Sequence, residues 1–148
     1  MTIGDYLDAA RVVFLEQADR AAATRVLIGH AADQGLLADR NGFERAISER
    51  ETILSTAVGQ GVAVPHAKLD GIAEFFVVVG ISSTPIEWDA PDRTPVHLVF
   101  LIGGPATQQT RYLQILAKIM LVVKNDDLRA RIRGASSGED VVATFSGI

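Results

Sequence analysis

The sequence contains no cysteine in its 148 residues, which excludes disulfides, thiolate nucleophiles and most structural zinc sites. Positively charged residues are also few. Lys and Arg total 14 against 18 Asp and Glu, and no basic cluster stands out, so a nucleic-acid partner is disfavoured. Phosphate chemistry would therefore require a local pocket instead of a broad basic surface.

Long apolar runs are missing as well. The strongest runs, Phe75–Val79 and Leu98–Ile102, are far too short to span a bilayer. The first residues, MTIGDYLDAA, carry Asp5 and Asp8 and lack the basic start and apolar core of a signal peptide. We therefore expect a soluble cytoplasmic domain without direct membrane insertion. With three histidines, none at helical i, i+4 spacing, and no cysteine, we expect neither a metal site nor a cofactor.

The residues that are present predict a single globular domain covering residues 1–148. Hydrophobic residues make up 48% and charged residues 22%, which is typical of a chain with a packed core. The runs Phe75–Ile81 and Val96–Ile102 are continuous and rich in β-branched residues, as in strands covered on both faces. Shorter strands are expected at Val12–Leu15 and Gly61–Val64. Together with the predicted helices, they indicate a three-layer α/β domain with a mixed central β-sheet flanked by helices.

Five helices are expected around these strands, with boundaries set by capping residues. They run from Asp19 to Gly35, from a cap at Asp39 or Asn41 to about Leu54, from Thr107 or Thr110 through Met120, from a cap at Asp126 to Gly134, and from Ser136 or Ser137 to about Phe145. Ser55–Gln60 is expected to be a loop. Residues 83–95 contain three prolines, which predicts a turn-rich surface connection.

The segment TAVGQGVAVPHAKLDG (residues 56–71) contains the histidine with the most informative setting. Pro65 biases Val64 towards extended backbone, so we expect His66 just beyond the carboxyl end of a strand. Ligands gather at that edge of open α/β sheets. An imidazole in this position, with a pKa near neutrality, can act as a base, a nucleophile or a ligand.

The residues before His66 fit an anion site. Gly59 and Gly61 would let backbone N–H groups approach an anion closely, and Ser55 and Thr56 add hydroxyl donors. The chemistry that fits best is nucleophilic attack of a neutral imidazole on phosphorus, which mainly needs positioning and cationic or N–H stabilisation. Arg50 and Lys68 are the nearest cations in sequence. The plainer alternatives are a loop histidine at position 66 and a surface charge at position 50.

The other two histidines have settings that favour structural or solvated roles. His30 lies inside a predicted helix, and His97 lies at the start of a predicted strand. His66 is therefore the candidate reactive histidine.

The pattern ERE-x3-ST-x2-G-x-G-x-A-x-PH, running from Glu49 to His66, resembles the signature of the enzyme IIA domain of the fructose/mannitol class of the bacterial phosphotransferase system. That class includes nitrogen-regulatory enzyme IIA proteins. The resemblance extends to IGDYLDAARVVF near the start, to PVHLVFLIGGP in the second core strand, and to LAKIMLVVKNDDLRARIRGASSGEDVVATF near the end. It covers essentially the whole chain.

This resemblance implies an α/β phosphocarrier domain. By position, His66 would accept a phosphoryl group from an HPr-type phosphocarrier protein, and Arg50 would stabilise the phosphate. Transport members pass the group to an enzyme IIB domain, whereas regulatory members bind a protein target according to their phosphorylation state. We slightly prefer the regulatory, nitrogen-type role, because the chain matches one free-standing domain.

The chain departs from the family pattern at one position. Many members have a second histidine early in the helix after the GGP loop, and the matching residue here is Tyr112, preceded by Arg111. A phenol donates one hydrogen bond but stays neutral at pH 7. Arg111 would compensate only if its side chain reached the phosphate. We therefore expect His66 to accept phosphate and onward transfer to be weaker. The alternatives are a non-catalytic protein-interaction module and an unrelated anion- or metabolite-binding domain.

Overall fold

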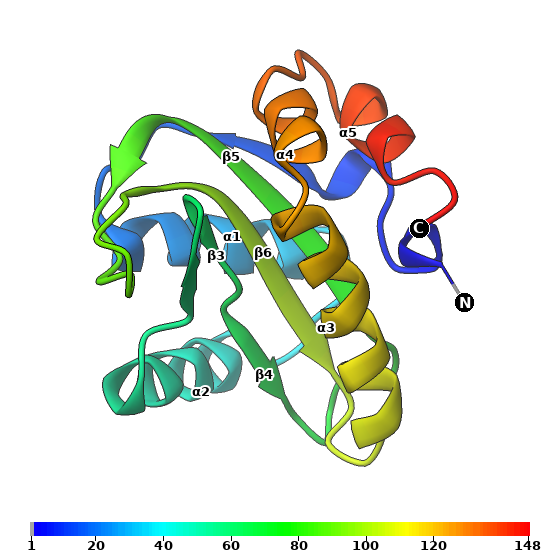
Figure 1. The fold of residues 1–148 in the computed structure, drawn as a ribbon. Helices are drawn as coiled ribbons and strands as arrows, with labels where there is room; N and C mark the ends of the chain where they lie inside the picture. The colour runs from blue at the N-terminus through cyan, green and yellow to red at the C-terminus, as the bar shows by residue number, and fades with distance from the viewer. Residues whose placement is uncertain (1) are drawn as a thin grey trace.

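The two longest apolar runs form a central antiparallel pair of strands, β5 (Phe76–Ile86) and β6 (Val96–Gly104), in the computed structural model (Figure 1). The structure describes residues 2–148. The other strands are β1 (Val12–Leu15), β2 (Ala57–Gly59), β3 (Val62–Ala63) and β4 (His66–Lys68). The α-helices are α1 (Arg20–Asp33), α2 (Arg40–Ile53), α3 (Gln109–Val123), α4 (Asp126–Arg133) and α5 (Gly138–Thr144), and two short 3-10 helices cover Ile3–Asp5 and Ala9–Arg11.

The sheet mixes parallel and antiparallel pairs. Its order is β1-β5-β6-β3-β2, and β4 pairs with β6 beyond the end of β3. β1 is parallel to β5, and both β3 and β4 are parallel to β6. The long strand β6 therefore pairs with β3 near its start (Val62 opposite Leu98) and with β4 near its end (His66 opposite Ile102).

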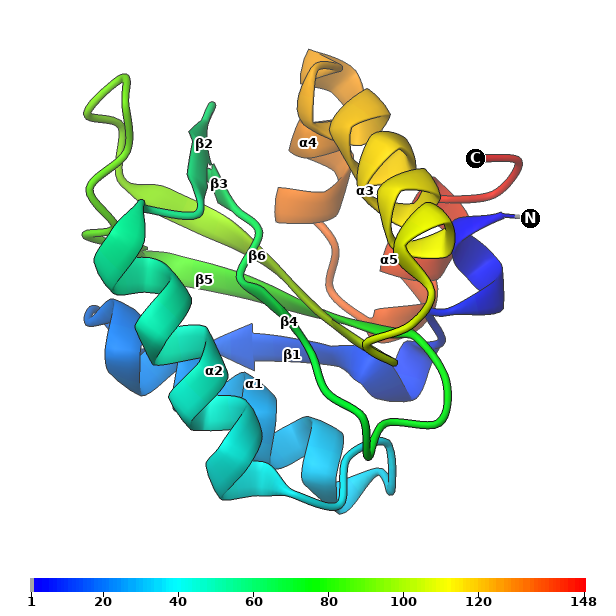
Figure 2. The ribbon, with the colours of Figure 1, turned by 90° about the horizontal axis from the view of Figure 1, so that it is seen from below.

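Helices cover both faces of the sheet. α1 and α2 pack on one face, and α3, α4 and α5 pack on the other (Figure 2). Each face of the sheet has its own hydrophobic core, and alternate residues of β5 point into one or the other. Val77 and Val79 belong to the core beside α3, whereas Phe76 and Val78 belong to the core beside α1. This period of two is that of a strand buried on both sides. It confirms the expected three-layer α/β fold in one domain.

The helix caps agree only partly with the sequence. The side chains of Asp19, Asp39 and Ser137 cap α1, α2 and α5 as expected. The cap of α4 was predicted one residue late, because the Asn125 side chain accepts the hydrogen bond from Leu128 N and Asp126 is already helical. In α3 the cap is Gln108 in place of either predicted threonine, and it makes no side-chain capping bond.

Two segments expected to be irregular contain strand. The predicted loop Ser55–Gln60 includes β2, which pairs with β3, and the predicted turn-rich connection is shortened because β5 continues to Ile86 across an irregularity. Both additions depend on a partner strand, since a three-residue strand has too few residues to show a periodic pattern.

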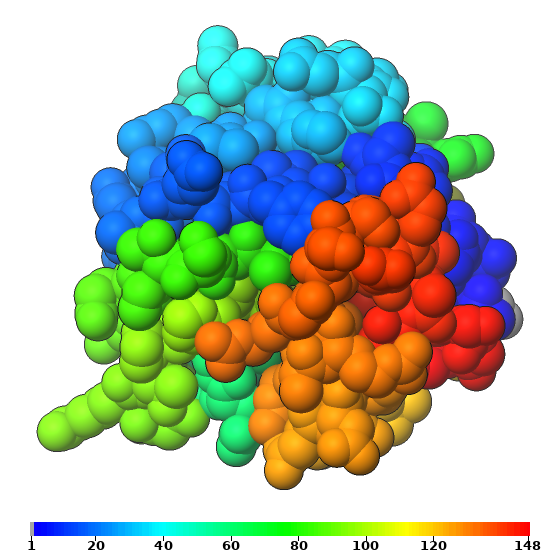
Figure 3. Space-filling view, turned by 90° about the horizontal axis from the view of Figure 1, so that it is seen from above, coloured from blue at the N-terminus to red at the C-terminus, as the bar shows by residue number. Residues whose placement is uncertain are grey.

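The two ends of the described chain lie together. Ile3 N donates to Ile148 O at 3.0 Å, and the C-terminal segment lies against the N-terminal segment in the space-filling view (red and blue, Figure 3). Across residues 2–148, no helix has both the length and the apolar character needed to cross a membrane.

Candidate functional site

His66 lies inside the sheet, as the first residue of β4. It follows the carboxyl end of β3, as expected, but it does not leave the sheet, because the chain pairs with β6 again after Pro65. A proline has no N–H to donate, but its carbonyl can accept, and Ile102 N donates to Pro65 O at 3.0 Å. The proline therefore interrupts the ladder without turning the chain away from β6.

The imidazole of His66 is held by the strand that precedes it. Its Nδ1 lies 2.9 Å from the carbonyl oxygen of Val64, which can only accept a hydrogen bond. Nδ1 therefore carries the proton when the ring is neutral, and the lone pair is on Nε2. The ring is half-buried, so one edge remains accessible.

An aromatic ring and two cations lie close to His66. The ring centroids of His66 and Tyr112 are 5.2 Å apart, with the planes tilted by 37°. The Lys68 ammonium lies 5.0 Å from the centroid of the Tyr112 ring and donates to Oε1 of Gln109. The positive charges of Arg50 and Lys68 both act on the His66 ring. Strand β4, helix α3 and the end of α2 thus converge on one histidine.

Arg50 is anchored where α2 ends. Its Nη1 donates to the carbonyl oxygen of Leu54 at 2.6 Å, and Leu54 N donates back to Arg50 O across the last turn. The guanidinium carries five N–H donors. Since this contact uses one nitrogen, most of the planar donor set can still bind an anion beside His66.

Burial and charge keep the site rings in defined protonation states. Burial lowers the pKa of His66 below its ordinary value of 6.5; the hydrogen bond to Val64 opposes this shift, and the nearby Arg50 and Lys68 add to it. Burial raises the pKa of the Tyr112 phenol above its ordinary 10.0, although Arg50 opposes this shift. At neutral pH the site therefore presents a neutral imidazole and a protonated phenol.

We expect the His66 ring to titrate with a midpoint below pH 6.5. Because the folded protein disfavours the charged ring, the unfolded chain binds the proton more tightly. The stability contributed by this group is therefore complete above pH 6.5 and is lost as the pH falls through the lowered pKa. An NMR titration of the imidazole proton signal, assigned by its disappearance in His66→Gln, measures the midpoint. A midpoint at or above pH 6.5 would contradict the geometry.

The hydroxyls of Ser55 and Thr56 are engaged away from His66. Ser55 Oγ donates to the carbonyl oxygen of Trp88 at 2.7 Å. Thr56 is buried, and its Oγ1 donates to the carboxylate of Glu51. The structure therefore does not bring these two predicted phosphate donors to the histidine.

Gly59 and Gly61 form the turn between β2 and β3. Both have left-handed backbone, with φ of 89° and 77°, and Gln60 between them has φ of 60°. Gln60 N donates to Asp92 at 2.9 Å, and this bond is the main cause that lowers the pKa of that carboxyl. Val62 and His66 pair with positions four residues apart on β6, which corresponds to about 13 Å. The glycines thus lie at the far end of β3 beside a carboxylate, an unfavourable place for a phosphate.

Arg111 lies on a different side of α3 from Tyr112. Its Nη1 donates to the hydroxyl of Tyr6 at 2.6 Å. Successive helical residues point about 100° apart, so the helix that directs Tyr112 to His66 directs its neighbour elsewhere. The structure does not place Arg111 where it would replace a second histidine.

Sequence reasoning missed two residues around the site. Gln109 binds Lys68 from the first turn of α3, and Glu51 supports β2 by accepting from both Thr56 N and Thr56 Oγ1. Glu51 was visible only as part of the ERE pattern. Within residues 2–148, no group of three or more His, Asp or Glu side chains could hold a metal ion.

Comparison with known proteins identifies one family. The family model described as "Phosphoenolpyruvate-dependent sugar phosphotransferase system, EIIA 2" matches residues 5–147. A fructose-specific EIIA component of this system from Haloferax volcanii is 34% identical over 124 residues, which cover 84% of this chain and 80% of that protein.

Solved structures show the same fold. The nitrogen regulatory protein IIA-Ntr from Neisseria meningitidis has a TM-score of 0.89 and 26% identity, with 97% of this chain and 99% of the other covered. The complex of mannitol enzyme IIA with phosphorylated enzyme IIB from Escherichia coli contains a chain with a TM-score of 0.83 and 17% identity, with 96% and 98% covered. The latter likeness concerns the fold alone.

Proposed function

Because the chain belongs to the EIIA 2 family of the phosphoenolpyruvate-dependent sugar phosphotransferase system, we propose that it is a phosphocarrier domain whose His66 accepts a phosphoryl group from an HPr-type protein. One observation carries this proposal. The Nδ1 of His66 is held by Val64, which leaves the lone pair on Nε2 of a half-buried ring, and the positive charges of Arg50 and Lys68 act on that ring.

The proposed step is an in-line displacement at phosphorus. The Nε2 lone pair of His66 forms a bond to phosphorus while the bond between phosphorus and the donor breaks, and the donor keeps that electron pair. The His66 ring gains positive charge and retains its Nδ1 proton, which donates to the Val64 carbonyl. Arg50 and Lys68 face the negative oxygens of the transferred group, the first with a planar donor set and the second with a point charge.

Labelling with the purified phosphotransfer chain tests this proposal directly. The protein is incubated with phosphoenolpyruvate, enzyme I and an HPr-type protein, and the product is analysed by mass spectrometry and ³¹P NMR. We expect one acid-labile phosphoryl group on Nε2 of His66. No label in the presence of an active donor, or a label on another residue, would reject the proposal.

Arg50→Gln is expected to slow phosphoryl acceptance by about 10-fold to 100-fold, because one charged donor set is lost from the transition state. Quenched-flow labelling with a fixed amount of phosphorylated donor gives the rate. Arg45→Gln is the matched control, since Arg45 is an exposed residue of the same helix. If both variants accept the phosphoryl group as fast as the wild type does, Arg50 has no role in the transfer.

Exposed apolar side chains beside the site support docking of a protein partner. Ile53 and Leu54, three and four residues after Arg50 at the end of α2, are 80% and 67% exposed. Large exposed apolar side chains next to a polar site are typical of protein-interaction sites. We propose that the HPr-type donor and a later partner, either an enzyme IIB domain or a regulatory target, bind here.

The role after phosphorylation depends on Tyr112, and we slightly favour regulation. An imidazole at this position could carry positive charge beside the phosphoryl group, whereas the protonated phenol stays neutral. The fructose-specific relative and the IIA-Ntr structure represent the transport and regulatory branches, and neither decides between them. The alternative is an interaction module that regulates partners without onward transfer.

Tyr112→His is expected to raise the rate of transfer to an enzyme IIB domain of the fructose or mannitol type by about 10-fold, because a chargeable ring then faces the phosphoryl group. Single-turnover transfer from the labelled protein measures this rate. Tyr112→Phe, which keeps the ring and removes the hydroxyl, separates packing from hydrogen bonding. Rapid transfer by the wild type, with no gain in Tyr112→His, would instead indicate a transport role.

A further inference from the structure

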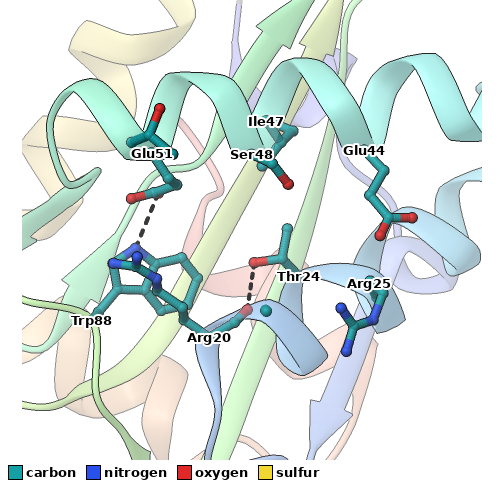
Figure 4. Close-up of a pocket in the computed structure, with 10 residues that line it drawn as sticks. Arg20, Thr24, Arg25, Glu44, Ile47, Ser48, Glu51 and Trp88 are labelled. Carbon is teal, nitrogen blue, oxygen red and sulfur yellow. Dashed lines mark hydrogen bonds between the residues drawn. The ribbon is translucent and has the colours of Figure 1, made fainter.

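A cavity of about 210 Å³ lies between α1 and α2, apart from the His66 site (Figure 4). Its walls come from the facing sides of the two helices, and Trp88 closes one end. Sites for drug-sized ligands usually occupy about 300–1,000 Å³. This cavity therefore suits a smaller molecule.

The two helices present opposite charges to the cavity. Arg20 and Arg25 line it from α1, and Glu44 lines it from α2 (Figure 4). Within residues 2–148 the salt bridges are Arg11–Asp8 and Arg129–Asp126, so neither of the cavity's arginines is paired with a carboxylate. The cavity thus has a cationic wall and an anionic wall, separated by the space between the helices.

A second carboxylate in the lining, that of Glu51, is already engaged. It accepts from Trp88 Nε1 at 3.2 Å and from both the backbone N and the hydroxyl of Thr56. These bonds hold the indole in place at the end of the cavity. Glu44 is left as the carboxylate that can accept from a ligand.

The remaining lining consists of the apolar residues Ala21, Ile47 and Trp88 together with the hydroxyl residues Thr24, Ser48 and Thr52. Ile47 and Trp88 are buried in the core between the helices and the sheet, and each turns one edge to the cavity. The hydroxyl of Thr24 donates to the Arg20 carbonyl at 2.7 Å, so it adds no free donor. An occupant would therefore place an apolar group against Ile47 and Trp88.

We propose that this cavity binds a free amino acid with an aliphatic side chain. Its carboxylate faces Arg25 and its ammonium group faces Glu44, which lie at the same end of the cavity, and its side chain packs on Ile47 towards Trp88 (Figure 4). A dianion would bring negative charge against Glu44, and a purely apolar ligand would desolvate the charged walls without pairing them. A zwitterion with an apolar side chain can pair with the charges of both walls and also pack on Ile47 and Trp88.

L-leucine is the probe, and the protein carries its own reporter, because Trp88 is the one tryptophan in the chain. We expect a saturable change in tryptophan fluorescence and a matching calorimetric titration, with a Kd of about 1 mM or tighter. Isocaproate lacks the ammonium group and isoamylamine lacks the carboxylate. Each should bind at least about tenfold more weakly, which corresponds to about 1.4 kcal/mol.

Variants of the two walls locate the site. Arg25→Gln and Glu44→Gln should each weaken leucine binding by about tenfold or more. Arg45→Gln and Glu49→Gln remove the same charges from exposed positions of α2 outside the cavity, and they should bind leucine like the wild type. Circular dichroism confirms that all four variants are folded.

Three results would overturn the inference. The first is the absence of a saturable signal up to about 10 mM leucine, which is ten times the highest Kd that we expect. The second is that isocaproate or isoamylamine binds as tightly as leucine. The third is that Arg25→Gln and Glu44→Gln bind leucine as tightly as the wild type. The measurement uses the unphosphorylated protein alone. It is therefore independent of whether His66 accepts a phosphoryl group.

Discussion

His66→Gln is expected to abolish phosphorylation by an HPr-type donor, with the initial rate falling by at least about 10³-fold. Glutamine fills a similar volume and can donate to the Val64 carbonyl, but its amide nitrogen has no lone pair suited to attack on phosphorus. No other nucleophile replaces the ring, because Tyr112 keeps its proton under the burial that raises its pKa. Initial rates of label incorporation at saturating donor measure the loss.

The other two histidines provide the controls. His30 contacts the carbonyl of Ala10, and His97 contacts the carbonyl of Ser82 at 3.2 Å, both away from β4. His30→Gln and His97→Gln should therefore incorporate label at nearly the wild-type rate. A variant without His66 that still accepted phosphate at a tenth of the wild-type rate would remove the basis of the proposed function.

Gly104→Ala is expected to destabilise the fold by about 3 kcal/mol, the upper part of the range for overpacking a core. A Cβ at this position would overlap the ring of Phe75, which is 5% exposed and has little room to move. For a chain of this size the melting temperature should fall by roughly 6–12 °C. Calorimetry and urea unfolding measure the change.

The same substitution should also disturb the site. Gly104 pairs with Lys68 on β4, and Leu69 N donates to Gly104 O at 3.0 Å, so a shift of β6 moves the strand that begins at His66. Gly71→Ala is the control: a Cβ there has no neighbour within 4 Å, and the stability should change by less than about 1 kcal/mol. Equal stability of the two variants would show that the contact with Phe75 relaxes without cost.

The helix boundaries show how far local chemistry reaches. Asp19, Asp39 and Ser137 are good caps by themselves, because a short polar side chain can bond to a backbone N–H two or three residues ahead. The start of α3 carries no such signal, since Gln108 makes no side-chain capping bond. That helix begins where the chain leaves β6 and packs on the sheet, which depends on contacts distant in sequence.

The candidate site was also predictable from the sequence only in part. The motif from Arg50 to His66 and the match at Tyr112 were visible in the sequence, and the structure brings these three residues together. Gly59 and Gly61 were expected to approach a phosphate because glycine backbone is flexible, and both do adopt left-handed backbone. Their partner, however, is the carboxylate of Asp92, a residue more than thirty positions along the chain.

The sequence by itself determined the class of fold and singled out His66 as the candidate reactive histidine. Apolar runs, caps and a Pro-His motif are local patterns, and each acts through the backbone of a few neighbouring residues. The tertiary structure alone decided which nitrogen of His66 is free, that Lys68 lies over Tyr112, that Arg111 turns towards Tyr6, and that α1 and α2 face each other with opposite charges across a cavity. These features depend on distances between side chains of different elements, which are set only when both faces of the sheet are packed.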